Sequence, residues 1–405
     1  MVTKAAPPRS PRSTAACVAA LSLLARDALA EPYRLRIDAY AEAPDPAAFV
    51  MVQAEARSDA ALLFDAEALV WTGVGVGVDG APEARGEAVI AAFRLRDPAH
   101  GLGLRFGRLL YHAGAVSPLH LDGGVASARS DTGTAIEVFG GMPVVSAFQA
   151  RTFDWVVGAR ASQDIASIAT VGYSYWQQRT DGRVARSELG IDGALSPHEA
   201  FALTATAAID TERFGVAEAR VSALFHRSFL RLELFGTRRS PSRMLPATSL
   251  FAALGSYDSD QVGVSGFLRP APRLDLSASA TLDRVGDEPG ATQELRAELR
   301  LDDDGRGALG LEGRRFSIPD ASWTGIRAFA RVPFGRRLAG SAELEVAVPD
   351  APKDRGVAWP WALLGLRWMP LPSLEAAGAL EVSSSPAYDV SFGGRLRLSG
   401  TWQSQ

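Results

Sequence analysis

A serine, two histidines and an aspartate lie close together in one short segment of this chain. They are His112, Ser117, His120 and Asp122. A serine nucleophile, a histidine base and a carboxylate form hydrolytic triads, but a triad is defined by its geometry and not by its sequence order. We interpret these residues as polar members of a loop, and we keep a lipid hydrolase as a minor alternative.

The sequence offers few residues that could bind a metal ion or a cofactor. The five histidines lack the spacing of a zinc site, and Cys17 is the only thiol. Gly73, Gly75 and Gly77 alternate with valines, and no helical pattern follows them, so a strand is favoured over a phosphate-binding loop. We therefore expect no metal, no cofactor and no enzymatic activity.

Charged residues recur at every second position in several segments. Because successive side chains of a strand point to opposite faces, such residues share one face. Arginine and glutamate on neighbouring strands form ladders of opposite charge, whereas selective rings carry one sign. The pattern predicts a weakly selective or salt-bridged interior lined by Arg231, Glu233, Glu294, Arg296, Glu298, Arg300, Glu343, Glu345, Arg395 and Arg397.

Apolar residues occupy the positions between these charges. Leucine and alanine alternate with charged residues from Glu294 to Leu301, and the segment from Leu274 to Asp283 follows the same pattern. The period of two persists to the C-terminus, and no helical stretch of comparable length interrupts it. One all-β domain of antiparallel strands is the simplest interpretation, and a parallel α/β fold is disfavoured.

Turn signals divide into a tight set and a longer, more polar set. The tight set is Arg57–Asp59, Asp97–Pro98, Ser130–Gly133, Ser196–His198, Pro270–Pro272, Asp302–Gly305, Gly335–Arg336 and Pro370–Pro372. The longer set is Asp79–Gly86, Gln178–Arg183, Arg238–Asp258, Val285–Gly290 and Pro349–Gly356. Such alternation is typical of bacterial outer-membrane barrels, in which the short turns face the periplasm.

The segments between these turns predict about 22 strands, within a range of roughly 16 to 22 because boundaries are imprecise. The predicted starts lie near residues 33, 48, 62, 84, 102, 123, 134, 152, 165, 183, 200, 215, 229, 258, 272, 290, 306, 321, 337, 356, 373 and 388. An even number places both chain ends on the periplasmic side. The pattern is least clear between Tyr111 and Val125.

Amphipathic strands can bury their apolar face in a soluble sandwich or turn it toward lipid in a closed barrel. The charges that run along whole strands favour the barrel, which alone satisfies the backbone of strands in lipid. Aromatic residues near strand ends suit a membrane interface. They are Tyr33, Trp71, Trp155, Trp323, Trp359, Trp368 and Trp402.

The N-terminus has the pattern of a secretory signal peptide. A basic start precedes an apolar core from Ala15 to Ala25, and Ala28-Leu29-Ala30 fits a signal peptidase site. We expect residues 1–30 to be removed and residues 31–405 to form the barrel. With a net charge of −4 and no basic stripe, the chain is not expected to bind nucleic acid.

The strand pattern of residues 31–405 resembles bacterial outer-membrane porin-like barrels. The final strand, with Leu396, Leu398 and Trp402 on one face, is similar to the signal that such proteins present to the barrel assembly machinery. A local likeness to alginate-export-type barrels rests on Gly107-Arg108 and the later Asp122-Gly123. The resemblance implies an outer-membrane location and contact with outer-membrane lipid.

The longest loop, Arg238 to Asp258, is too apolar for a purely solvated segment. It carries Arg239, Arg243 and Tyr257 among several apolar residues. We consider equally that it folds into the lumen as a constriction and that it packs on the outer rim.

Two functions remain open at this point. The first is a porin-like channel for passive diffusion of small solutes. The second is a non-conducting structural or assembly barrel of the cell envelope. The sequence does not distinguish a solute or an oligomeric state.

Overall fold

The structure is a computed structural model that describes residues 33–43, 47–57, 63–76, 81–144, 154–180, 182–244, 257–319, 321–351, 358–385 and 388–404. The predicted signal peptide, residues 1–30, lies outside the described residues. The same holds for residues 245–256 of the predicted constriction loop. No helix within the described ranges is both long and apolar enough to cross a membrane.

Twenty-two strands make up almost all of the described chain. They are β1 (Tyr33–Ala43), β2 (Ala47–Arg57), β3 (Leu63–Val76), β4 (Pro82–Asp97), β5 (Leu102–Tyr111), β6 (Leu119–Arg129), β7 (Thr134–Pro143), β8 (Trp155–Ile165), β9 (Ala169–Thr180), β10 (Arg183–His198), β11 (Phe201–Asp210), β12 (Gly215–Arg227), β13 (Leu230–Arg239), β14 (Ser259–Ala271), β15 (Leu274–Val285), β16 (Glu288–Arg300), β17 (Ala308–Ser317), β18 (Trp323–Pro333), β19 (Leu338–Pro349), β20 (Trp359–Leu371), β21 (Leu374–Ser385) and β22 (Tyr388–Gln403). A short helix, α2 (Pro241–Met244), follows β13.

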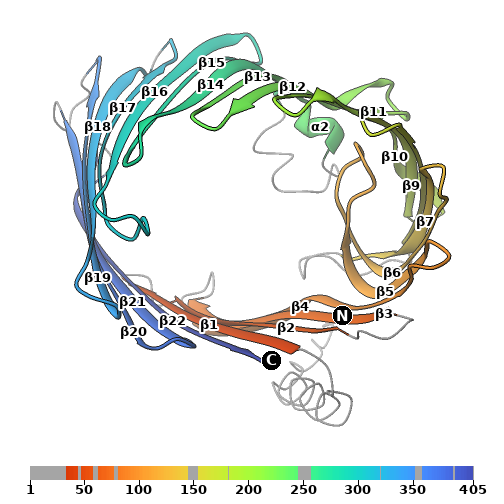
Figure 1. Cartoon of the computed structure of the whole chain (residues 1–405), viewed down its shortest axis with the longest axis horizontal. Coiled ribbons are helices and arrows are strands. Elements are labelled where there is room, and N and C mark those ends of the chain that lie inside the picture. Colours follow the sequence, from red (N-terminus) through yellow and green to blue (C-terminus); the bar gives the residue numbers. More distant parts are fainter. Residues whose placement is uncertain are drawn as a thin grey trace, which may run out of the picture.

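Each strand pairs antiparallel with its neighbours in sequence, and β1 pairs with β22 to close the ring (Figure 1). Closure leaves the sheet without a free edge, which is why strands can stand in lipid in this form. The two ends of the described chain meet, because the Tyr33 amide donates to Ser404 Oγ at 2.8 Å. We call this end of the barrel the terminal rim and the opposite end the loop rim.

The predicted all-β fold and the strand number of 22 are confirmed. The porin-like barrel that the sequence resembles is therefore confirmed as a fold. The largest shifts in strand start are at β6, which begins at Leu119 rather than 123, and at β9, which begins at Ala169 rather than 165. At β6 the ladder with β5 continues to the pair Tyr111–Leu119, beyond the point at which alternation becomes unclear in the sequence.

The two faces of the sheet differ in chemistry around the ring. Large aliphatic side chains remain exposed on one face, for example Leu295 at 64%, Leu344 at 62% and Leu380 at 71%. They do not meet in a dry centre, so the soluble sandwich considered above does not describe this molecule. The apolar face points out of the barrel, as a lipid-facing wall requires.

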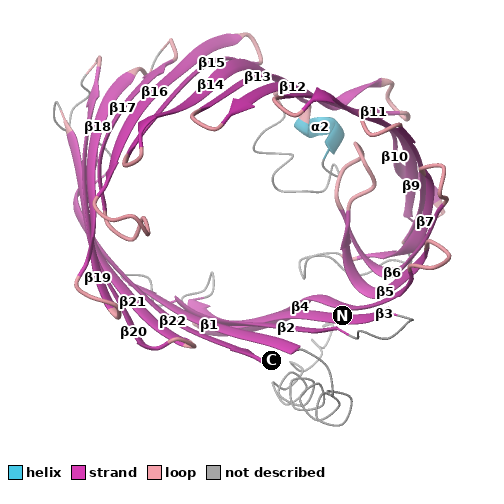
Figure 2. Ribbon diagram, viewed as in Figure 1, coloured by secondary structure: helices cyan, strands magenta, loops and turns pink. Residues whose placement is uncertain are grey.

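The connections lie near the predicted turn signals, but their lengths do not follow the predicted division. The connection between β15 and β16, from the longer set, has only two residues, whereas the one between β16 and β17, from the tight set, spans residues 301–307. The tight turns that lie within the described ranges follow even-numbered strands and are therefore at the terminal rim, whereas the segment after β13 is at the loop rim. Figure 2 shows the described turns as loops between the strands of the ring. Trp155, Trp323 and Trp359 begin their strands, and Trp402 is one residue from the end of β22. Trp71 is different, since it lies well inside β3.

Candidate functional site

The ten charged residues predicted to line the interior all lie on the strand face opposite the exposed leucines and valines. In β16 the exposed Leu295 and Leu299 alternate with the four predicted charges. The registers of β13, β19 and β22 place their predicted charges on the same side of the continuous sheet.

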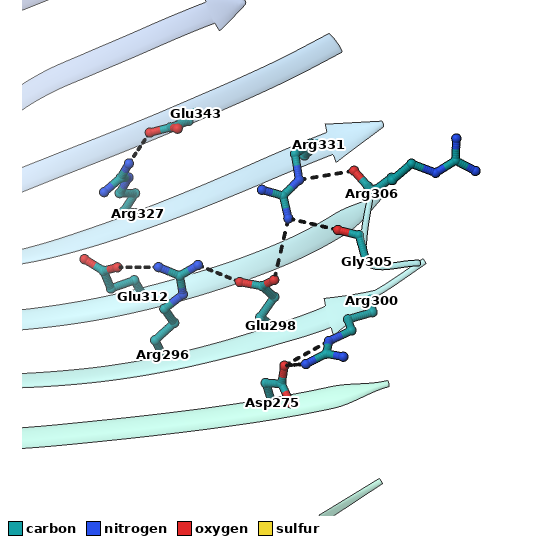
Figure 3. Close-up of polar contacts among 10 residues, drawn as sticks. All are labelled: Asp275, Arg296, Glu298, Arg300, Gly305, Arg306, Glu312, Arg327, Arg331 and Glu343. Atoms are coloured by element: carbon teal, nitrogen blue, oxygen red, sulfur yellow. Dashed lines mark hydrogen bonds and ion pairs between the residues drawn. The ribbon is translucent and has the colours of Figure 1, made fainter. Parts of the chain in front are cut away.

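Ion pairs link neighbouring strands from β15 to β19, in three separate groups (Figure 3). Arg296 lies 4.0 Å from Glu312 and also pairs with Glu298 at 2.5 Å. Arg331 approaches Glu298 at 4.0 Å. Glu312 is only 4% exposed in the structure, and it was not among the charged residues selected from the sequence. The predicted ladder of opposite charges is therefore present, and it extends to residues that alternation alone did not select.

The other predicted charges have partners of opposite sign as well. Arg231 lies 3.7 Å from Glu233, and Arg395 lies 3.2 Å from Glu42. The further pairs are Arg300 with Asp275, Arg314 with Glu294, Arg327 with Glu343, and Arg397 with Glu375. Glu345 is opposite Arg327 in the β18–β19 register. This face is polar but close to balanced in charge.

The three residues predicted for the constriction loop are at the loop rim. Arg239 bonds to Glu218 at 3.0 Å on the neighbouring strand. Arg243, on α2, lies 3.6 Å from Asp210. Tyr257 is 68% exposed. The described parts of this segment thus pack against the ends of β11 and β12, and the constriction itself remains a prediction for residues outside the described ranges.

A different segment folds inward, and sequence analysis did not predict it. The connection between β5 and β6, residues 112–118, projects into the ring of strands toward β9 and β10 (Figure 1). Its residues Ala113 and Val116 are fully buried. We call residues 109–121 the inward hairpin.

A buried carboxylate holds the tip of the inward hairpin. Glu188 of β10 is 0% exposed. Its two oxygens accept hydrogen bonds from the Ser117 amide at 2.9 Å, from Ser117 Oγ at 3.0 Å and from Trp176 Nε1 at 3.1 Å. Arg186 forms an ion pair with Glu188 and donates to Ser117 Oγ at 2.9 Å. A buried charge that is paired and fully hydrogen-bonded makes a specific anchor.

Close backbone approach fixes the hairpin at a second point. Gly114 has a φ of +64°, and a Cβ there would lie 1.7 Å from Arg160 Nη1. Arg160 forms a double hydrogen bond to Asp192, at 2.9 and 2.7 Å. Gly190 of β10 leaves room for Val116, since a Cβ on it would lie 2.8 Å from Val116 Cγ1. The tip therefore fits onto the inner wall of β8 to β10.

A buried apolar core forms between the inward hairpin and the wall, and half of its members belong to the hairpin. Its buried members are Ala92, Leu109, Ala113, Val116, Leu119, Leu121, Val125, Phe139, Val156 and Trp176. Full burial of such side chains contributes about 1.5–3 kcal/mol each for the larger ones. The hairpin is thus a packed part of the fold and not a solvated loop.

The residues considered for a hydrolytic triad bond to separate partners. Ser117 binds Glu188 and Arg186, as described above. His120 Nε2 bonds to the Val89 carbonyl at 2.7 Å, and Asp122 accepts two bonds from Arg108 at 2.7 and 2.9 Å. The interpretation as loop residues holds for His112 and Ser117, which lie between β5 and β6. It is wrong for His120 and Asp122, which belong to β6. The described residues contain no cluster of His, Cys, Asp or Glu that suits a metal ion.

Two signals in the sequence pointed toward this region. The alternation becomes unclear between Tyr111 and Val125, which the structure explains by the departure of the hairpin from the wall. The dipeptides Gly107-Arg108 and Asp122-Gly123 lie directly opposite each other in the β5–β6 register. Neither signal reveals the partner Glu188, which is far away in sequence.

One loop carboxylate has a perturbed pKa. Asp350 follows β19 and accepts a hydrogen bond from Arg315 Nη1 at 2.6 Å. The hydrogen bond and the positive charge of Arg315 lower the pKa of Asp350 below its ordinary value. Asp350 therefore keeps its negative charge in mild acid, and its ion pair with Arg315 of β17 persists there.

Comparison with known proteins supports the fold. No family model and no curated protein matches the chain. The translocation pore of the P pilus usher PapC is similar, with a TM-score of 0.53 at 7% identity, over 92% of this chain and 99% of that one. OccAB2 of Acinetobacter baumannii has a TM-score of 0.47 at 10% identity, over 93% of this chain and 98% of that one. OccK5 of Pseudomonas aeruginosa has a TM-score of 0.41 at 10% identity, over 92% of this chain and 98% of that one. The likeness to the usher pore concerns the fold alone.

Proposed function

We propose that this protein is an outer-membrane channel for passive diffusion of small solutes, with a lumen partly closed by the inward hairpin. The observation that carries the proposal is the opposite chemistry of the two faces. Exposed aliphatic residues cover the outside of the closed barrel, and paired charges cover the inside. A polar lumen behind an apolar wall suits the passage of hydrated solutes.

The ten predicted charges and their partners would form the walls of this lumen. Most carry a partner of opposite sign within 4.0 Å, such as Arg231 with Glu233 and Arg331 with Glu298. Such pairs cancel most of the field that would select ions by sign, because selective pores use rings of one sign. The channel is therefore expected to be weakly selective.

The location and the partners follow from the same proposal. Residues 1–30 would direct secretion, the barrel assembly machinery would insert the strands, and outer-membrane lipid would contact the aliphatic wall. Membrane fractionation, together with gel mobility before and after heating, tests this part. A protein recovered in the soluble fraction without detergent would contradict it.

Planar-bilayer recording of purified, folded protein tests the channel. We expect single-channel openings and a reversal potential near zero in a salt gradient. Protein that is shown to be folded by heat-modifiable mobility but gives no openings would overturn the proposal.

A second candidate is a non-conducting structural or assembly barrel of the envelope. The buried, multiply bonded hairpin favours it, since a fixed element occupies part of the interior. This candidate predicts no conductance and a partner that is recovered by cross-linking in the envelope.

A further inference from the structure

A groove of about 670 Å³ lies on the charged face of the wall and crosses β18 to β22, β1 and β2. It follows two neighbouring rows of residues, and within each row the residues are directly opposed across the sheet. The first row is Arg331, Ser341, Gly365, Ala379, Arg395 and Glu42. We call this feature the lumen groove, because Arg395 is one of the charges predicted to line the lumen.

The lumen groove rises from one rim of the barrel toward the other. Arg331 is two residues from the end of β18, at the terminal rim, and Glu42 is one residue from the end of β1, at the loop rim. The strands of a closed barrel are tilted, so a row of opposed residues climbs along the barrel axis. With about 4.8 Å between strands, the row from β18 to β1 is roughly 24 Å long. An elongated solute can therefore follow the groove along the lumen.

Small side chains form the floor of the groove. The second row is Ala339, Arg367, Ala377, Arg397, Tyr40 and Phe49. In both rows the positions between the arginines are alanine, glycine or serine. The wall therefore recedes between the arginines, which leaves a hollow track with guanidinium groups along its sides.

A turn borders the groove at the terminal rim. Gly305 and Arg306, in the connection between β16 and β17, line the groove. Arg331 donates to the carbonyl of Arg306 at 3.2 Å and to that of Gly305 at 3.3 Å (Figure 3). Asp302 accepts hydrogen bonds from the amides of Arg306 at 2.7 Å and Gly307 at 2.9 Å. The border is thus bonded both within the turn and to the wall.

Two aromatic rings lie at the other end of the groove. Tyr40 and Phe49 are stacked with their centroids 4.5 Å apart. Phe49 is nevertheless 43% exposed on the charged face. Its opposite in β3 is Gly73, which has no side chain to cover the ring. An exposed aromatic surface on a polar wall is suited to contact with a ligand.

The charges beside the groove are compensated. Arg367 and Arg397 both pair with Glu375, the former at 2.7 Å. Arg395 lies 3.2 Å from Glu42. These pairs present N–H donors and carboxylate acceptors with little net charge. Hydroxyl groups both donate and accept, so a neutral polyol matches them. An anion would compete with the carboxylates, and an apolar solute would leave polar groups without partners.

We propose that the lumen groove binds neutral oligosaccharides. The apolar face of a sugar ring lies against Phe49, and the hydroxyl groups of the following rings bond along the paired charges. The long track with a small-residue floor suits a chain of sugar rings better than a single ring. The inference rests on the proposed solute channel and names the class of solute that this channel would take.

Calorimetric titration with maltohexaose tests the aromatic end of the groove. The purified barrel is kept in a detergent without a sugar head group. Phe49→Ala should raise the dissociation constant about tenfold, which corresponds to about 1.4 kcal/mol. Phe267→Ala is the matched control and should leave binding unchanged, because Phe267 is opposite Arg231 on the charged face and is not among the residues that line the groove. Equal effects of the two variants, or no binding by the wild type, would overturn the proposal.

A filled floor tests the track itself. Ala377→Leu places a larger side chain between Arg367 and Arg397, so binding of maltohexaose should weaken about tenfold or more. Ala376→Leu is the control, because Ala376 is opposite Leu398 on the lipid-facing side of the same strand. Unchanged binding in a folded Ala377→Leu protein would refute the site.

An acidic sugar tests the neutrality of the ligand. Hexagalacturonate has a similar length but carries a carboxylate on every ring, so it should bind more weakly than maltohexaose. Tighter binding of the acidic sugar would contradict the assignment of a neutral ligand.

Bilayer recording separates this inference from the channel proposal. Openings without calorimetric binding of maltohexaose would reject the groove and leave the channel. Calorimetric binding without openings would reject the channel and leave the groove.

Discussion

At the scale of single residues, the interior depends on a few buried polar contacts. Glu188 is surrounded by donors from three segments, namely Ser117, Trp176 and Arg186. An unpaired buried charge is costly, so each partner depends on the others. The exposed ion pairs of the wall differ, because solvent screens them and each contributes about 0–1 kcal/mol.

Glu188→Gln should therefore loosen the tip of the inward hairpin. The substitution keeps the shape of the side chain but leaves Arg186 without its counter-charge. We expect docking of residues 112–118 to weaken by about 2–4 kcal/mol. Amide hydrogen exchange of this segment measures the effect. Glu294→Gln, whose pair with Arg314 is 3.6 Å long and about one-third exposed, should leave exchange in the segment unchanged. An equal effect of both variants would count against the anchor.

Gly114→Ala should displace the tip by a collision. The new Cβ would meet Arg160 at 1.7 Å and Asp192 at 2.4 Å, in addition to the strain of a left-handed backbone. Gly182→Ala is the matched control, because its φ is +76° and nothing lies within 4 Å. The control should cost only about 1 kcal/mol, and Gly114→Ala should cost more, measured by unfolding from vesicles in urea. Similar losses would show that the close approach at Gly114 is unimportant.

At the scale of elements, the inward hairpin and the strand wall have different tasks. The wall is built from local pairings of consecutive strands, which the ladders show from β1 to β22. The hairpin instead makes contacts across several strands, from residues 113–117 to β8, β9 and β10. The inward hairpin can therefore be shortened without loss of any strand ladder of the wall except the one between β5 and β6.

Replacing residues 112–118 by Asn-Gly tests the hairpin as a constriction. The two-residue turn joins the paired ends Tyr111 and Leu119 directly. We expect larger single-channel conductance with heat-modifiable mobility retained, because an obstacle leaves the lumen while closure of the barrel does not change. Unaltered conductance in a folded variant would mean that the hairpin lies outside the conducting path.

At the scale of the whole molecule, stability in a membrane depends on which face meets lipid. Adjacent residues of β15 allow a direct comparison. Ala280 is exposed on the outer face, and Ser279 faces Glu294 on the inner one. The proposal therefore predicts that a charged side chain is destabilising at Ala280 and tolerated at Ser279, although the two native side chains are similar in size.

Ala280→Arg should destabilise the membrane-inserted barrel by about 2–4 kcal/mol if this height is near the bilayer midplane. Ser279→Arg should be nearly neutral, because the new guanidinium reaches a wet interior beside a carboxylate. Urea titration of folding into phosphatidylcholine vesicles measures both. The reverse order of stability would place the aliphatic face away from lipid.

The sequence by itself determined the wall of this protein. Alternation of the kind seen from Glu294 to Leu301 depends only on the period of a strand, and turn residues mark where each strand ends. In an up-and-down barrel consecutive strands are also neighbours in space. Local pattern therefore sufficed for the strand number, for the location of the turns and for the shared face of the ten charges.

Only the tertiary structure decided what fills the interior. Ser117 and Glu188 are far apart in the chain, and their contact arises from the curvature of the barrel and the bend at Gly107. Alternation cannot report such contacts, because it records the face of a residue and not its distant partner. The constriction by the loop from Arg238 to Asp258 stays a prediction. Because alternation records only the face, it also did not reveal that the segment between Tyr111 and Val125, whose pattern was least regular, packs inside the barrel.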